Sequence, residues 1–70
     1  MNSDLYLNKE IYEANVIRKC IIAFSRVAQI SLVQMNNYYI CNFFECLVDQ
    51  EKVKDEFENY LIYLTNIGDE

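Results

Sequence analysis

The stretch "YYICNFFECLV", residues 38–48, decides the fold because it is apolar on both faces that an extended strand presents. Successive side chains of a strand point to opposite faces, so a strand with one wet face alternates apolar with polar residues. Only Asn42 and Glu45 interrupt the apolar run. We therefore predict a central strand whose odd positions bury against helices and whose even positions form an open face.

The preceding segment "AQISLVQM", residues 28–35, predicts a second strand joined to the first by a tight hairpin. Asn36-Asn37 suits a two-residue turn because asparagine tolerates positive φ. This turn places Met35 opposite Tyr38. The predicted core face collects Ala28, Ile30, Leu32, Tyr39, Cys41 and Phe43. The predicted open face collects Gln29, Ser31, Val33, Met35, Tyr38, Ile40, Asn42 and Phe44.

A short strand and a helix precede this hairpin. In "DLYLN", residues 4–8, Leu5 and Leu7 alternate with an outward Tyr6, as expected of a strand. From Glu13 to about Arg26 apolar residues recur at helical spacing. They are Val16, Ile17, Cys20, Ala23, Phe24 and Val27.

A longer helix follows the hairpin. Asp49 is a good N-cap, and Gly68 is placed to end the helix in the left-handed conformation. The predicted inner stripe is Val53, Phe57, Tyr60, Leu61, Leu64 and Ile67.

The predicted order is therefore β-α-β-β-α in a single α+β domain spanning residues 1–70. A right-handed crossover followed by a hairpin puts the third strand between the other two, with both helices on one face. This is a three-stranded sheet like a ferredoxin-like fold that lacks its last strand. Its open face would be a large apolar patch for a monomer. We predict a partner-binding site formed by Val33, Met35, Tyr38, Ile40, Asn42 and Phe44, and a possible second surface at Asn59 and Tyr63.

The composition offers little catalytic chemistry. The chain has no histidine, no CxxC pair and no glycine-rich loop, so we predict no catalytic residue, metal or cofactor. Three cysteines are an odd number, and we interpret Cys20, Cys41 and Cys46 as reduced core thiols of a cytoplasmic protein. The alternative is one exposed reactive thiol, with Cys46 as the candidate, in a redox protein.

The charge of the chain and its lack of long apolar segments limit the classes of partner that it is expected to bind. The net charge of −5 arises after residue 48, where seven acids face two lysines. An acidic surface repels phosphate, so we expect no nucleic-acid or anionic-membrane partner; the acids serve solubility or a basic partner surface. No apolar run approaches the roughly 20 residues of a membrane span, and the N-terminus lacks the apolar core of a signal peptide.

On the predicted core face Glu45 is unusual, because it is an acid in an otherwise apolar strand. We expect its carboxylate to reach water or to pair with Lys9, Lys52 or Lys54.

The segment "LNKEIYEANVIRKCIIAFSRVAQISL", the hairpin and "DEFENYLIYLTNI" together resemble the small protein HxsD of the His-Xaa-Ser peptide-modification systems. The matching positions are Ile11-Tyr12, Val16-Ile17, Cys20, Phe24-Ser25, Phe57, Asn59 and Leu61. The family continues into a Leu-Arg-Glu-like tail, where this chain has Leu64-Thr65-Asn66. The resemblance covers about residues 5–67 and implies a non-catalytic accessory protein that accompanies a radical SAM enzyme.

Two main hypotheses follow. In the first, the chain is an interaction protein that binds a partner enzyme or precursor peptide in a radical SAM-linked maturation system. In the second, it is a structural module that forms a homo-oligomer through its open sheet face. Both predict that the even side of residues 38–48 is an interface, and an enzymatic role is a third and weaker hypothesis.

Overall fold

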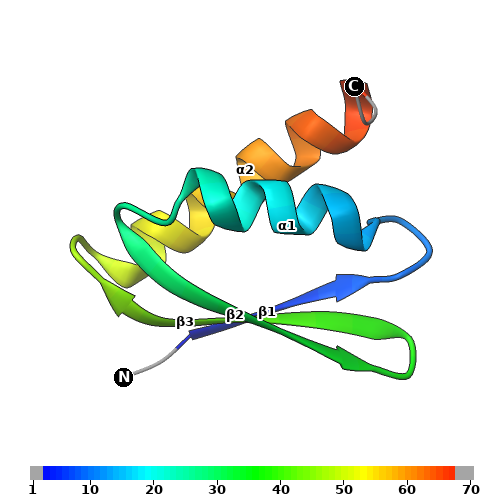
Figure 1. Cartoon of the computed structure of the whole chain (residues 1–70), viewed down its shortest axis with the longest axis horizontal. Helices are drawn as coiled ribbons and strands as arrows, with labels where there is room; N and C mark the ends of the chain where they lie inside the picture. Colours follow the sequence, from blue (N-terminus) through cyan, green and yellow to red (C-terminus); the bar gives the residue numbers. More distant parts are fainter. Residues whose placement is uncertain (1–2, 68–70) are drawn as a thin grey trace.

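Three strands and two helices follow one another in the predicted β-α-β-β-α order (Figure 1). The computed structural model describes residues 3–67. The elements are β1 (Ser3–Asn8), α1 (Ala14–Ala23), β2 (Ala28–Met35), β3 (Tyr38–Cys46) and α2 (Gln50–Ile67). The predicted α+β fold class is confirmed.

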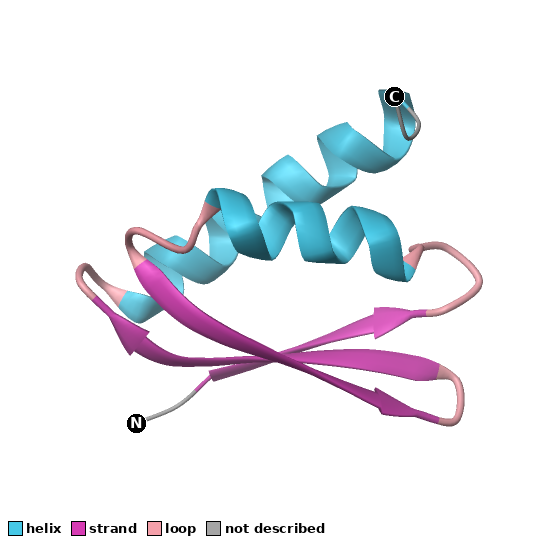
Figure 2. Cartoon of the chain, viewed as in Figure 1, coloured by secondary structure: helices cyan, strands magenta, loops and turns pink. Residues whose placement is uncertain are grey.

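The sheet has the strand order β1-β3-β2, so residues 38–46 form its central strand as predicted. Strand β3 is antiparallel to both neighbours. Both helices lie on one side of the sheet, and no helix or strand of residues 3–67 lies on the opposite side (Figure 2). One sheet face is therefore covered by helices and the other is open.

The hairpin register is the predicted one near the turn. Met35 lies opposite Tyr38, and Asn36-Asn37 forms the turn between them. The backbone N–H of Lys9 donates to the Asn37 carbonyl at 3.0 Å, which ties the end of β1 to the same turn. All three strands are thereby held in register at this end of the sheet.

The core lies between the sheet and the helices and is formed by apolar side chains from every element. Its buried members are Leu5, Leu7, Val16, Ile17, Cys20, Ala28, Cys41, Phe43, Val53, Phe57 and Leu61. Phe57 lies at its centre, with ring centroids 5.1 Å from Phe43 and 5.5 Å from Phe24, both edge-to-face. The Cys20 thiol donates to the Phe57 carbonyl at 3.5 Å, joining the two helices.

A β-bulge in β3 moves Glu45 off the predicted core face, while its carboxylate reaches water as expected. Ile30 pairs with Phe43, but Gln29 pairs with Glu45, so Phe44 is an extra residue on the central strand. The extra residue reverses the alternation, and Glu45 lies exposed on the open face opposite Gln29. Of its expected partners, Lys9 instead donates from Nζ to Gln34 Oε1 at 3.1 Å.

The same bulge explains how Cys46 reaches the core side, in keeping with its interpretation as a core thiol. Strict alternation assigns this even position to the open face, but Cys46 pairs with the buried Ala28 and packs against the core. Strict alternation fails at this position because a periodic pattern cannot reveal a single inserted residue, whereas the core-thiol interpretation holds in part, since Cys46 is half-buried.

The helices differ from prediction at their ends. Helix α1 ends at Ala23, and residues 24–27 form turns in which the Val27 N–H donates to the Phe24 carbonyl. At the start of α2 the Asp49 cap is confirmed, since Asp49 Oδ1 accepts from the Glu51 N–H at 3.0 Å. The expected role of Gly68 lies outside the described residues.

The inner stripe of α2 is narrower than predicted. Val53, Phe57 and Leu61 are buried, whereas Tyr60 and Ile67 are exposed. The last turn of α2, which ends at Ile67, lies away from the sheet (Figure 1), so no strand of the described residues covers Ile67. Tyr60 lies beside the Phe24 ring, with centroids 6.2 Å apart, and stays partly exposed.

Candidate functional site

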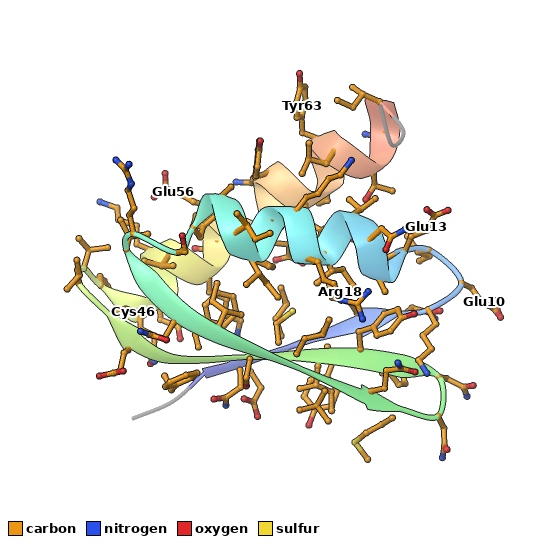
Figure 3. The ribbon with its side chains drawn as sticks, viewed as in Figure 1. Glu10, Glu13, Arg18, Cys46, Glu56 and Tyr63 are labelled. Atoms are coloured by element: carbon orange, nitrogen blue, oxygen red, sulfur yellow. The ribbon has the colours of Figure 1, made fainter. Side chains whose placement is uncertain are left out.

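The open sheet face is organised in rows that cross the three strands. One row is Tyr6, Ile40 and Val33, and the row nearer the turn contains Tyr38 and Met35. We call these five residues the apolar patch. The side chains of this face project away from the helices (Figure 3). The patch therefore lies where no part of the chain between residues 3 and 67 covers it.

The apolar patch is largely accessible. Tyr6 is 61% exposed, Met35 55% and Val33 49%, while Ile40 is half-buried at the centre of the sheet. Tyr6 and Tyr38 meet edge-to-face with ring centroids 6.2 Å apart. Together with the turn they border a hollow of about 270 Å³. The hollow is lined by Tyr6, Met35, Asn36, Asn37, Tyr38 and Ile40. It offers an apolar side chain of a partner a place to insert.

A polar row bounds the apolar patch. Asp4, Asn42 and Ser31 lie side by side across the sheet, and Asn42 Nδ2 donates to Asp4 Oδ1. Beyond this row, at the bulge, the exposed Phe44 lines a second hollow of about 470 Å³. The other residues of that hollow come half from the ends of β2 and β3 and half from the loops that join these strands to the helices. They are Ser25, Arg26, Val27, Ala28, Gln29, Glu45, Cys46 and Leu47.

Of the six predicted partner-binding residues, the structure brings four together and separates two. Val33, Met35, Tyr38 and Ile40 belong to the apolar patch, as the hairpin register predicts. The other two are Asn42, which lies in the polar row, and Phe44, which lies beyond it. The predicted single surface is therefore two apolar areas with a polar strip between them.

Tyr6 belongs to the apolar patch but is missing from the partner-binding site predicted from the sequence. Its outward orientation is predictable from the alternation of Leu5 and Leu7, but the predicted site includes residues of the hairpin only. Because β1 pairs directly with β3, Tyr6 lies beside Ile40 and completes the row. The predicted strand order, with the first strand beside the third, already implies that Tyr6 lies next to Ile40.

The possible second surface lies on the helix layer. Tyr63 and Asn59 are exposed on α2, and Tyr63 points away from the sheet (Figure 3). Tyr63 stacks on Tyr60 with ring centroids 6.2 Å apart and an interplanar angle of 17°. This pair is on the opposite side of the molecule from the apolar patch, so the two surfaces would engage different partners or different parts of one partner.

Two of the three thiols are expected to be unreactive in the folded protein. Burial raises the pKa of Cys41 to about 12, and burial followed by the neighbouring Cys41 raises the pKa of Cys20 to about 12. A thiol with such a pKa is protonated at neutral pH, and the thiolate is the reactive form. Cys46 is only partly buried and lines the hollow at the bulge.

We expect alkylation of the native protein at pH 7.5 to modify Cys46 first. Cys20 and Cys41 should react at least about 100-fold more slowly because they are buried and protonated. Pulse labelling with iodoacetamide, followed by peptide mass spectrometry, measures the three rates. The Cys46→Ser variant is the control and should be nearly inert until urea unfolds it. Rapid native labelling of Cys20 or Cys41 would contradict the buried arrangement.

Within residues 3–67, no group of three or more Cys, Asp or Glu side chains is arranged to hold a metal ion. No helix in the same range is long and apolar enough to cross a bilayer. Comparisons with protein-family models, with curated proteins and with solved structures find no match to this chain.

Proposed function

We propose that this chain is a non-catalytic accessory protein that binds a partner enzyme or a precursor peptide in a radical SAM-linked peptide maturation system. The single observation that carries the binding role is the exposed apolar patch on the open sheet face. Exposed aromatic and aliphatic side chains grouped in this way are typical of protein–protein interaction sites. The part of the proposal that concerns a peptide maturation system rests on the resemblance to HxsD.

The free strand edges support the same role. Strands β1 and β2 each pair only with β3, so within the described residues each has an outer edge with unpaired backbone groups. An extended peptide can add to such an edge through main-chain hydrogen bonds, while pockets select its side chains. Because Tyr6 and Met35 belong to the edge strands, a peptide added at either edge would lie beside the apolar patch.

The second candidate is self-association, favoured by the same exposed patch. Two copies that pack their open faces together would bury the patch without another partner. A stable interface requires about 800 Å² from each partner, more than the apolar patch alone provides, since its five side chains are already partly covered. A face-to-face dimer would therefore have to include the polar row.

The proposed function is tested by genes and by binding. We expect a radical SAM gene beside the gene for this chain, and we expect the tagged chain to co-elute with the encoded enzyme or its precursor peptide after co-expression. Size-exclusion chromatography with mass spectrometry identifies the complex. A neighbourhood without such a gene, or co-expression without a complex, would contradict the proposal.

A further inference from the structure

The charges of the open face have one sign. Among the residues of β1, β2 and β3 that face this side, the charged ones are Asp4 and Glu45, both acidic. Lys9, which follows β1, extends on the other side: its Nζ binds Gln34 Oε1 and lies 5.2 Å from the centroid of the Tyr39 ring. The apolar patch is thus adjacent to carboxylates, and no strand residue brings a base to its face.

Asp4 is the carboxylate next to the patch. It is exposed and lies two residues from Tyr6 on the same strand, which corresponds to about 7 Å along the sheet. Asn42 donates to Oδ1 and holds the carboxylate in the polar row. The other oxygen, Oδ2, can accept a hydrogen bond from a bound partner. Glu45 lies further away, in a hollow that Arg26 also lines.

We propose that the open face binds a peptide segment that carries a basic residue beside an aliphatic or aromatic anchor. The anchor enters the hollow between Tyr6, Tyr38 and Ile40, and a lysine or arginine of the segment pairs with Asp4. The separation of about 7 Å corresponds to residues two apart in an extended peptide. This inference rests on the proposed function and adds the chemistry of its partner.

Charge complementarity favours such a segment over a second copy of the chain. Face-to-face packing of two copies would cover Asp4 on each with strands that carry no basic residue on their open side, and desolvating an unpaired carboxylate is costly. Like charges brought together across an interface add to that cost. A basic peptide removes both penalties, because its cation pairs with the carboxylate as the anchor buries apolar area.

The test uses the whole chain and a random dodecapeptide library displayed on phage. We expect peptides selected on the immobilised chain to be enriched in lysine or arginine close to an aromatic or aliphatic residue. The strongest peptide is then synthesised with a fluorescent label, along with a version in which its basic residue is glutamine. Fluorescence anisotropy gives the dissociation constants of both.

Two isosteric variants locate the effect. On the wild-type chain, the glutamine peptide should bind about threefold more weakly, the scale of an exposed ion pair. Asp4→Asn, which keeps the acceptor for Asn42, should abolish this difference. Asp55→Asn removes the same charge from the exposed surface of α2 and should leave the difference unchanged. Neither change touches the core, so both variants are expected to fold.

The outcomes separate this inference from the function on which it rests. Selected peptides that bind the open face without basic enrichment would overturn the inference and leave the interaction role standing. Equal effects of Asp4→Asn and Asp55→Asn would also overturn it. They would indicate that the overall negative charge of the chain attracts the peptide, rather than an ion pair at Asp4. A chain that selects no peptide and is a dimer through this face would overturn both.

Discussion

Replacing Phe57 with alanine is expected to remove about 3–5 kcal/mol from the free energy of unfolding. A chain of 70 residues has a total of only about 4–10 kcal/mol, so much of the variant should be unfolded at 37 °C. The physical reason is that Phe57 is fully buried and contacts both Phe24 and Phe43, which come from different layers of the fold. Urea unfolding followed by circular dichroism measures the loss.

Tyr63→Ala is the matched control for Phe57→Ala. Tyr63 is an aromatic residue of the same helix but is 57% exposed and stacks only on Tyr60 among the ring contacts of the described residues. We expect its removal to change the free energy of unfolding by less than about 1 kcal/mol. If the two alanine variants were equally stable, the core would not be centred on Phe57.

Replacing Ile40 with glutamate is expected to weaken binding of the library-selected peptide by about 30-fold or more. The change puts a carboxylate at the centre of the apolar patch, where truncating a central anchor typically costs at least about 2 kcal/mol. The fold should survive because Ile40 faces away from the core that the neighbouring Cys41 enters. Anisotropy gives the affinity, and circular dichroism reports whether the domain remains folded.

Ile22→Glu is the control for Ile40→Glu. Ile22 is 70% exposed on α1, so this change adds the same charge to the helix layer. We expect its effect on peptide binding to be less than twofold. Equal losses from Ile40→Glu and Ile22→Glu would show that the open face is not the binding surface. If the chain self-associates through this face, Ile40→Glu should also convert the dimer to a monomer.

The parts of the fold that depend on local patterns were predictable from the sequence. Alternation in residues 4–8, the Asn36-Asn37 turn and the Asp49 cap each rest on interactions within a few residues, and the structure contains all three. The strand order followed because short connections allow few topologies. Four patch residues then followed from the hairpin register.

The errors arose where tertiary structure overrides a regular pattern. The bulge at Phe44 moves Glu45 to the open face and Cys46 to the core side, and a period of two cannot encode one extra residue. Ile67 continues the helical stripe, but the last turn of α2 lies away from the sheet that would bury it. In both cases the neighbouring structural element determines which side chains are buried.

Amide chemical-shift mapping shows directly whether the open sheet face binds a partner. The ¹⁵N-labelled chain would be titrated with the library-selected peptide. We expect the largest shifts at Tyr6, Val33 and Ile40, with the amides of Asn59 and Tyr63 nearly unchanged. Shifts confined to α2 would place the binding surface on the helix layer and contradict binding at the open sheet face.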